Sequence, residues 1–304
     1  MLVASHLRKE YATVVAVDDV SFQVNDGEIF GLLGPNGAGK TTSIRMILNV
    51  IAPDQGEVTF DGKPMNDESR NLVGYLPEER GLYRKNKLLN TILYFAGLKG
   101  IPLAEAKRRA YEWLKRFDLL SYYDRKVEEL SKGNQQKVQF IISILHDPKL
   151  VILDEPFSGL DPINQILLKD ILSELKQKGK AIIFSTHMME QAEKLCEKIC
   201  LINRGKVVLE GELAEVKRRF GKNAVHLEFD GDGSFLKTLP TVKQALVYEN
   251  TAELELNDHS ASSNLLRDIA PRLNVRKFEF QEPSLHSIFL KVVGNSETTE
   301  AVRS

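Results

Sequence analysis

The chain has 304 residues, of which 42% are hydrophobic and 27% charged, and its 41 basic residues almost balance its 42 acidic residues. This composition is typical of a globular protein with room for one large and one small domain, and the even charge balance argues against nucleic acid as a partner. No segment approaches 18 uninterrupted apolar residues and the N-terminus lacks the apolar core of a signal peptide, so we expect a cytosolic chain with no membrane insertion of its own.

The first strands are expected near the N-terminus. Residues Met1 to Glu28 and Gly56 to Pro64 contain short alternating apolar and polar runs with Asp-Gly turns. Alternation of this kind indicates half-buried strands joined in hairpins. We therefore expect a small antiparallel layer of short strands beside the main sheet.

A glycine-rich segment, Gly34 to Thr42, lies between an apolar run at Ile29 to Leu33 and a helical pattern at Ser43 to Leu48. Its sequence, GPNGAGKTT, contains the complete GxxxxGK[ST] pattern in the strand, loop and helix context that a phosphate-binding loop requires. In such a loop the backbone N–H groups surround the phosphates, Lys40 reaches the β- and γ-phosphates, and the Thr41 hydroxyl binds a Mg²⁺ ion. We therefore expect this segment to bind a nucleoside triphosphate with Mg²⁺. The residues expected to contact it are Gly34, Asn36, Gly37, Ala38, Gly39, Lys40, Thr41 and Thr42.

The character of the sequence changes at Leu88 to Tyr123, where apolar residues recur at helical spacing. Beyond it, the segment Leu130 to Lys137, LSKGNQQK, precedes an apolar helical pattern at Val138 to Leu145. Taken alone, Ser131 is well placed to cap that helix. The sequence thus predicts a helical lobe between the glycine-rich loop and the next strand.

Two further buried strands are expected to end in polar residues. The run Lys149 to Pro156 ends with Asp154 and Glu155, and the run Lys180 to Ser185 is followed closely by His187. Because ligands of open α/β sheets sit at the C-terminal edge of the strands, all three side chains should lie near the phosphates. We expect Asp154 to hold the Mg²⁺ shell and Glu155 to orient and deprotonate the attacking water. A histidine at a strand end is often structural, but a γ-phosphate at this edge favours a polar contact for His187.

The segment Leu130 to Lys137 resembles the LSGGQ signature of ABC-type ATPases. By this resemblance, Ser131, Gly133, Asn134 and the positive end of the following helix would bind a γ-phosphate. Lys132 stands where a second glycine is usual, and Asn134 stands where glutamine is usual. Both substitutions keep a hydrogen-bond donor near the phosphate, so we expect altered kinetics and not loss of function.

Further positions match the same family. The SGLD segment ending at Asp161 is similar to the D-loop, in which Asp161 would help couple two facing sites. Tyr11 matches the aromatic residue that stacks on adenine, with an ordinary packed tyrosine as the alternative. Glu78 occupies the position of the usual Q-loop glutamine, and because a carboxylate cannot donate a hydrogen bond, its role in positioning water stays open. The candidate catalytic residues are Glu155, His187, Glu78 and Asp161, and the candidate metal ligands are Thr41, Asp154 and Glu78.

The resemblance also implies partners. In this family the signature of one subunit closes over the ATP held by another, so we expect a head-to-tail homodimer with two ATP molecules at its interface. We also expect docking on transmembrane permease subunits, through a groove near the segment Gly81 to Lys87 with Tyr83 and Arg84 as candidate contacts. The protein would then be cytoplasmic and peripheral on the inner face of the cell membrane.

The sequence after Arg219 lacks nucleotide motifs and alternates between strand and helix patterns. The order βαββαβ plus a closing helix predicts a ferredoxin-like module. It resembles the small C-terminal domain of ATP-binding subunits of the sodium-extrusion and drug or bacteriocin export type. The expected strands are Ala224 to Asp230, Val242 to Asn250, Thr251 to Asn257 and Val275 to Gln281, and the expected helices are Phe235 to Leu239, Ser260 to Leu273 and Ser284 to Val293.

The predicted fold class is α/β: a P-loop NTPase core of the ABC type, with a parallel sheet between helices, a flanking antiparallel layer, a helical signature lobe at about residues 85–145 and a small α+β ferredoxin-like domain. The expected domains are 1–220 and 221–294, with a flexible tail at 295–304. The resemblance implies the ATP-hydrolysing subunit of an ABC transporter, more specifically an exporter. The alternatives are an ABC-type ATPase that acts on ribosomes or DNA, which a single cassette disfavours, and a non-hydrolysing nucleotide switch, which Glu155 and His187 disfavour.

Overall fold

The computed structural model describes residues 1–79, 81–221, 224–257 and 262–301. The chain divides into two units, Met1–Glu210 and Gly211–Ser304. Helix α8 (Leu213–Arg219) lies before the domain boundary expected at residue 220 but falls in the second unit.

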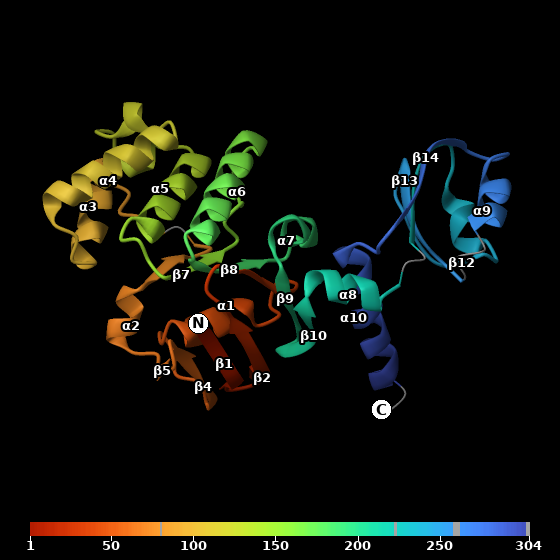
Figure 1. Cartoon of the computed structure of the whole chain (residues 1–304), viewed down its shortest axis with the longest axis horizontal. Helices are drawn as coiled ribbons and strands as arrows, with labels where there is room; N and C mark the ends of the chain where they lie inside the picture. The colour runs from red at the N-terminus through yellow and green to blue at the C-terminus, as the bar shows by residue number, and fades with distance from the viewer. Residues whose placement is uncertain (80, 222–223, 258–261, 302–304) are drawn as a thin grey trace. The chain divides into compact units, whose positions relative to one another are not determined.

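A six-stranded sheet in the order β10-β9-β3-β8-β7-β6 forms the centre of the first unit (Figure 1). Parallel pairing joins β9 to β3, β3 to β8, β8 to β7 and β7 to β6. Every residue of β3 and β7 is buried, which explains why these strands read as unbroken apolar runs. The strands are β3 (Ile29–Leu33), β6 (Val73–Leu76), β7 (Leu150–Asp154), β8 (Ala181–Thr186), β9 (Lys198–Asn203) and β10 (Lys206–Glu212).

The expected antiparallel layer is present as a second sheet in the order β2-β1-β4-β5. Its first two strands are longer than predicted, because a two-residue turn joins them directly and β-bulges absorb the twist along the ladder. Helix α1 packs between the two sheets in a shared apolar core (Figure 1). The elements are β1 (Leu2–Tyr11), β2 (Val14–Val24), β4 (Gln55–Phe60), β5 (Lys63–Pro64) and α1 (Lys40–Ile47).

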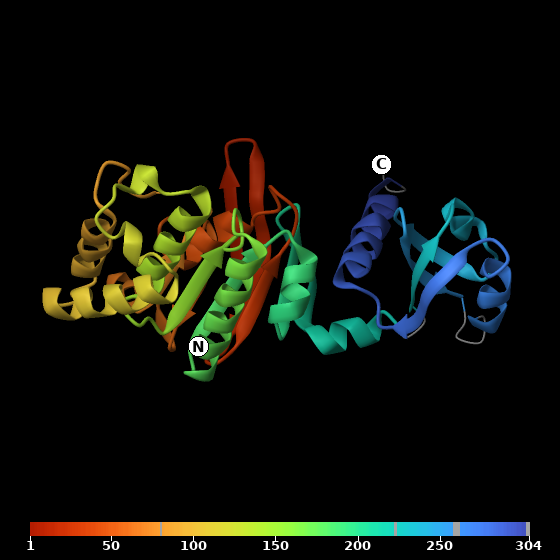
Figure 2. The same ribbon diagram turned by 90° about the horizontal axis from the view of Figure 1, so that it is seen from above.

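The remaining helices of the first unit include the predicted lobe, in which α3, α4 and α5 contact one another (Figure 2). Helix α5 begins at Lys132, six residues before the expected apolar pattern, because Ser131 caps it and the polar residues that follow are already helical. No helix in the described part of the chain has the length and apolar character needed to cross a membrane. The helices are α2 (Asp67–Asn71), α3 (Leu88–Leu98), α4 (Leu103–Arg116), α5 (Lys132–Ile144), α6 (Pro162–Gln177) and α7 (Met189–Leu195), with 3₁₀ turns at Leu120–Tyr122 and Val127–Glu129.

The second unit contains an antiparallel sheet in the order β12-β13-β11-β14, which is the strand order of a ferredoxin-like fold. Helices α9 and α10 lie on opposite faces of this sheet (Figures 1 and 2). The first expected helix is a 3₁₀ helix, η3, and α10 continues beyond the expected end at Val293 into the predicted tail. Residues 260–261 of the expected second helix and 302–304 of the tail lie outside the described residues. The elements are β11 (Ala224–Asp230), η3 (Ser234–Thr238), β12 (Val242–Val247), β13 (Thr251–Leu256), α9 (Ser262–Ile269), β14 (Asn274–Gln281) and α10 (Leu285–Ala301).

Candidate active site

The glycine-rich loop connects the end of β3 to the start of α1 at Lys40. Gly37 and Gly39 have φ angles of 78° and 107°, in the left-handed region that favours glycine. A Cβ atom on Gly39 would lie 2.4 Å from the Ala16 carbonyl oxygen, so no larger residue fits without a backbone shift. The loop conformation therefore depends on the glycines that the sequence pattern singled out.

The Lys40 side chain lies within this loop and is only 6% exposed. Its Nζ donates hydrogen bonds to the carbonyl oxygens of Gly34 (2.8 Å) and Pro35 (3.1 Å). Burial lowers the pKa of Lys40, while the nearby Glu155 and Asp154 carboxylates act in the opposite direction. A buried ammonium held only by neutral carbonyls is a favourable partner for an incoming anion.

Asp154 ends β7 and contacts the glycine-rich loop directly. Thr41 Oγ1 donates a hydrogen bond to its Oδ2 (3.0 Å), and Ser185 Oγ donates one to its Oδ1 (2.8 Å). Burial raises the pKa of Asp154, an effect that these two hydrogen bonds oppose. A carboxylate and a hydroxyl in contact beside a phosphate loop are oxygen donors of the kind that Mg²⁺ prefers. The described residues contain no cluster of three or more His, Cys, Asp or Glu side chains that could hold a metal, but Mg²⁺ bound with phosphates and water does not need one.

Glu155 follows Asp154 in the left-handed backbone region, with φ of 50°, and its side chain turns toward the end of β8. Its Oε2 accepts a hydrogen bond from Thr186 Oγ1 (2.9 Å). Its Oε1 accepts one from the His187 backbone N–H (2.9 Å) and lies 2.6 Å from His187 Nδ1. Three groups from one strand end therefore fix both oxygens of this carboxylate. Sequence reasoning placed His187 at this edge but missed the part played by Thr186.

These residues surround a cavity of about 650 Å³. Ten of the predicted site residues line it: Asn36, Gly37, Ala38, Gly39, Lys40, Thr41, Thr42, Glu78, Asp154 and Glu155. Five lining residues were not predicted, because the turns that bring them here carry no phosphate-binding pattern: Val14, Val15, Ala16, Arg204 and Gly205.

Other predicted site residues lie outside this lining. Tyr11 is exposed at the end of β1 and pairs with Val14, which does line the cavity. Ser131 caps α5 by accepting a hydrogen bond from the Asn134 N–H (3.2 Å), and Asp161 caps α6 in the same way. The structure thus gives both residues a capping role within the chain, and their predicted roles toward ATP stay predictions.

The N-terminus of α5 packs against the loop that follows Glu155. A Cβ on Gly133 would lie 2.9 Å from the Gly159 carbonyl oxygen, so the two backbones are in close contact. One turn further along α5, Gln136 Nε2 donates a hydrogen bond to the Pro156 carbonyl oxygen (3.3 Å). The start of α5 and the loop after Glu155 are therefore in direct contact within one chain.

Comparison with known proteins agrees with this geometry. The family described as ABC transporter matches residues 17–158, and the family described as ATP-binding protein DrrA1-3-like, C-terminal domain, matches residues 211–293. The uncharacterised ABC transporter ATP-binding protein YhaQ of Bacillus subtilis is 45% identical over 97% of this chain and 99% of its own length. The chain belongs to the ABC transporter ATP-binding proteins. As a member of a family of ATP-hydrolysing cassettes, it is an ATPase.

Two further similarities extend the comparison. The Nod factor export ATP-binding protein I of a Rhizobium species is 33% identical over 95% of each chain. A solved structure of an ATP-binding subunit of an ABC transporter superposes with a TM-score of 0.68 at 33% identity, covering 72% of this chain and 93% of the solved one. The predicted ABC-type α/β fold is thus confirmed.

Proposed function

We propose that this ABC ATP-binding protein drives an exporter as a head-to-tail homodimer docked on two separate membrane subunits, at the cytoplasmic face of the membrane. The placement of the signature residues carries the proposal. Among the described residues, Ser131, Gly133 and Asn134 lie outside the lining of the nucleotide cavity, at the N-terminus of a 13-residue helix. N–H groups at a helix N-terminus attract anions, so this end is suited to the phosphates of a second copy of the chain.

Within each cavity, different residues have different roles in ATP hydrolysis. Lys40 exchanges its carbonyl partners for the β- and γ-phosphates, and Thr41, Asp154 and Glu78 would hold Mg²⁺, which would stabilise negative charge on the phosphates. Glu155 accepts a proton from the attacking water, and the three groups that fix its oxygens keep it in position. At the cavity mouth, the exposed ring of Tyr11 stacks on the base.

A groove of about 380 Å³ in the same unit supports docking on a membrane subunit. Its wall is largely apolar and includes Leu82, Phe95 and Leu98. Tyr83, half exposed, packs edge to face on Tyr94, with ring centroids 5.6 Å apart. Exposed aromatic rings beside an apolar groove are typical of protein interaction sites. We propose that Tyr83 and its exposed neighbour Arg84 contact the membrane partner.

The direction of transport is inferred from the second unit and from the relatives. The Rhizobium relative is named as an export protein and is similar along nearly its whole length. The C-terminal family match covers the ferredoxin-like unit that the sequence linked to export subunits. We therefore infer export, of a species that the membrane subunits select.

Affinity capture from detergent-solubilised membranes tests this proposal. The bait is the tagged Glu155→Gln variant with ATP, which should bind ATP without hydrolysing it and hold the dimer together. We expect a polytopic membrane protein to be captured in near-stoichiometric amount. The matched control adds Tyr83→Ala and Arg84→Ala to the same bait, and it should recover much less.

Other results would contradict specific parts of the proposal. Capture of ribosomes or nucleic acid in place of a membrane protein would favour an ATPase that acts on those partners. Equal ATP hydrolysis by the wild type and by Glu155→Gln would overturn the assigned role of the carboxylate. Loss of ATPase activity in the isolated Tyr83→Ala, Arg84→Ala protein would show that these residues act on hydrolysis and not on docking.

A further inference from the structure

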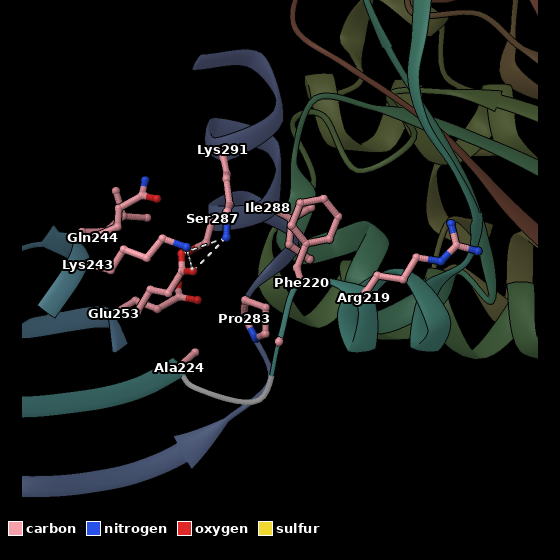
Figure 3. Close-up of a pocket in the computed structure, with 13 residues that line it drawn as sticks. Arg219, Phe220, Ala224, Lys243, Gln244, Glu253, Pro283, Ser287, Ile288 and Lys291 are labelled. Atoms are coloured by element: carbon pink, nitrogen blue, oxygen red, sulfur yellow. Dashed lines mark hydrogen bonds and ion pairs between the residues drawn. The ribbon is translucent and has the colours of Figure 1, made fainter. Parts of the chain in front are cut away.

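The second unit contains a cavity of about 250 Å³ (Figure 3). It lies between α10 and the face of the sheet opposite α9. Its charged lining includes Lys243 of β12, Glu253 and Glu255 of β13 and Lys291 of α10, and Phe220 contributes an aromatic ring. No residue of the nucleotide cavity belongs to this lining.

Strand alternation places the acidic residues on this face. Along β13, Ala252 and Leu254 are buried in the apolar core under α9, so Glu253 and Glu255 point to the opposite face. Helix α10 covers part of that face with Ile288, which is only 1% exposed. The cavity is the space that α10 leaves above these polar positions.

The charges in the cavity are paired but retain hydrogen-bonding capacity. Glu255 accepts hydrogen bonds from Lys243 Nζ (2.9 Å) and from Lys291 Nζ (2.8 and 3.0 Å). Each ammonium has three N–H donors, so the bonds to Glu255 use only part of that capacity. Glu253 accepts from the Ser284 N–H and Oγ, both at 2.7 Å, and each carboxylate oxygen has a second lone pair.

The lining therefore offers both cationic donors and anionic acceptors within a few residues of one another. Two lysines and two glutamates give the charged cluster a net charge of zero, because the Arg219 side chain points away from it (Figure 3). A ligand with a single charge would use only one of the two sets, the free N–H donors or the free carboxylate lone pairs, and would add an uncompensated charge to a balanced cluster. A zwitterion satisfies both sets.

The remaining wall is apolar and the cavity is small. The Phe220 ring stands beside Ile288, and Lys291 Nζ lies 5.8 Å from the ring centroid (Figure 3). A volume of 250 Å³ is below the usual range of drug-sized ligand sites, so only a small molecule fits. We propose that this cavity binds a free amino acid with a large apolar side chain. Its carboxylate contacts Lys243 and Lys291, its ammonium contacts Glu253, and its side chain packs on Phe220.

Isothermal titration of the full chain without ATP tests this proposal, and because no hydrolysis is measured the result is independent of the proposed function. The probes are L-phenylalanine, L-leucine and L-methionine, with 3-phenylpropionate and phenethylamine as analogues that each carry one of the two charges. We expect at least one amino acid to bind with a Kd below about 1 mM, and each single-charge analogue of phenylalanine to bind at least about tenfold more weakly than phenylalanine.

Matched variants locate the site. Lys243→Met and Phe220→Ala should each weaken binding of the best amino acid by about tenfold or more, one through charge and the other through apolar contact. Lys277→Met is the control, because Lys277 lies outside the lining, is similarly exposed and is paired with Glu279. Thermal melting checks that each variant is folded. If one of the two lining variants fails to fold, the other still tests the site.

Several results would overturn the proposal. One is that none of the three amino acids binds at concentrations up to about 10 mM. Another is that 3-phenylpropionate binds as tightly as phenylalanine, which would make the cavity an anion site. A third is that Lys277→Met loses as much affinity as Lys243→Met.

Discussion

Replacing Thr186 by valine removes one of the three groups that hold the carboxylate of Glu155, the proposed catalytic base, while keeping the shape of the side chain. Thr186 is 2% exposed, and its Oγ1 donates to Glu155 Oε2 (2.9 Å) and accepts from the Met188 N–H (3.0 Å). Valine cannot make either bond. We expect Glu155 to remain bound to His187 through its other oxygen but to lose its fixed orientation toward the attacking water.

The size of the effect follows from the type of bond lost. A hydrogen bond to a charged group contributes about 1.5–3 kcal/mol, which corresponds to a decrease in kcat of about 10- to 150-fold if it is lost entirely in the transition state. Because His187 still contacts one oxygen, we expect the lower end of this range, about tenfold. The KM for ATP should change little, since Thr186 lies outside the lining of the nucleotide cavity.

Steady-state ATPase assays of three proteins decide the matter: the wild type, Thr186→Val and Thr186→Ser. Serine keeps the hydroxyl, so Thr186→Ser should retain most of the ATPase activity. If the role of Thr186 were purely steric, Thr186→Val would be the more active of the two variants. If Thr186→Val hydrolyses ATP at the wild-type rate, the hydrogen bond to Glu155 does not position the base. A rise in KM with unchanged kcat would instead place Thr186 in nucleotide binding.

Three further predictions address other contacts. Ser185→Ala removes a donor to Asp154 and should raise the Mg²⁺ concentration for half-maximal activity by about tenfold, as a titration at fixed ATP would show; an unchanged midpoint would argue against metal binding by this carboxylate. Gly133→Ala places a Cβ 2.9 Å from the Gly159 oxygen, a steric conflict that costs about 1–3 kcal/mol. ATPase activity should therefore fall, while nucleotide binding by the monomer is retained. Full ATPase activity would mean that this contact relaxes freely. Burial lowers the pKa of His146 from 6.5 to about 4, so the unfolded chain binds more protons between these values and stability is lost as pH falls from 6.5 toward 4. Urea unfolding followed by the single tryptophan should show a loss of about 2 kcal/mol between pH 7 and pH 5, and His146→Gln should remove most of it; an equal loss in that variant would assign the effect to other groups.

Local sequence patterns predicted those parts of the site that local sequence determines. The loop at Gly34 to Thr42 and the buried strands β7 and β8 follow from glycine placement and unbroken apolar runs, and the parallel sheet then brings Asp154, Glu155 and His187 to one edge. The hydrogen bond from Thr186 to Glu155 was not predictable, because it depends on the side-chain conformation of Glu155, whose backbone is left-handed.

Other features depend on tertiary contacts that leave no local signal. The hairpin residues Val14 to Ala16 reach the nucleotide cavity only because the antiparallel layer folds against α1. In the second unit, the order of strands and helices was readable from alternation, but the amino-acid cavity depends on how α10 crosses the sheet and on the pairing of Leu246 with Glu253. Neither relation leaves a pattern within a single segment.

The contacts between α5 and the loop after Glu155 would couple the two ATP sites of the proposed dimer. In the proposed dimer, the N-terminus of α5 reports on the nucleotide of the partner, while Pro156 adjoins the catalytic carboxylate of its own site. A displacement of α5 when one γ-phosphate leaves is therefore transmitted through two contacts to the base that acts on the other ATP. In such a dimer, hydrolysis at one site would change the rate of hydrolysis at the other.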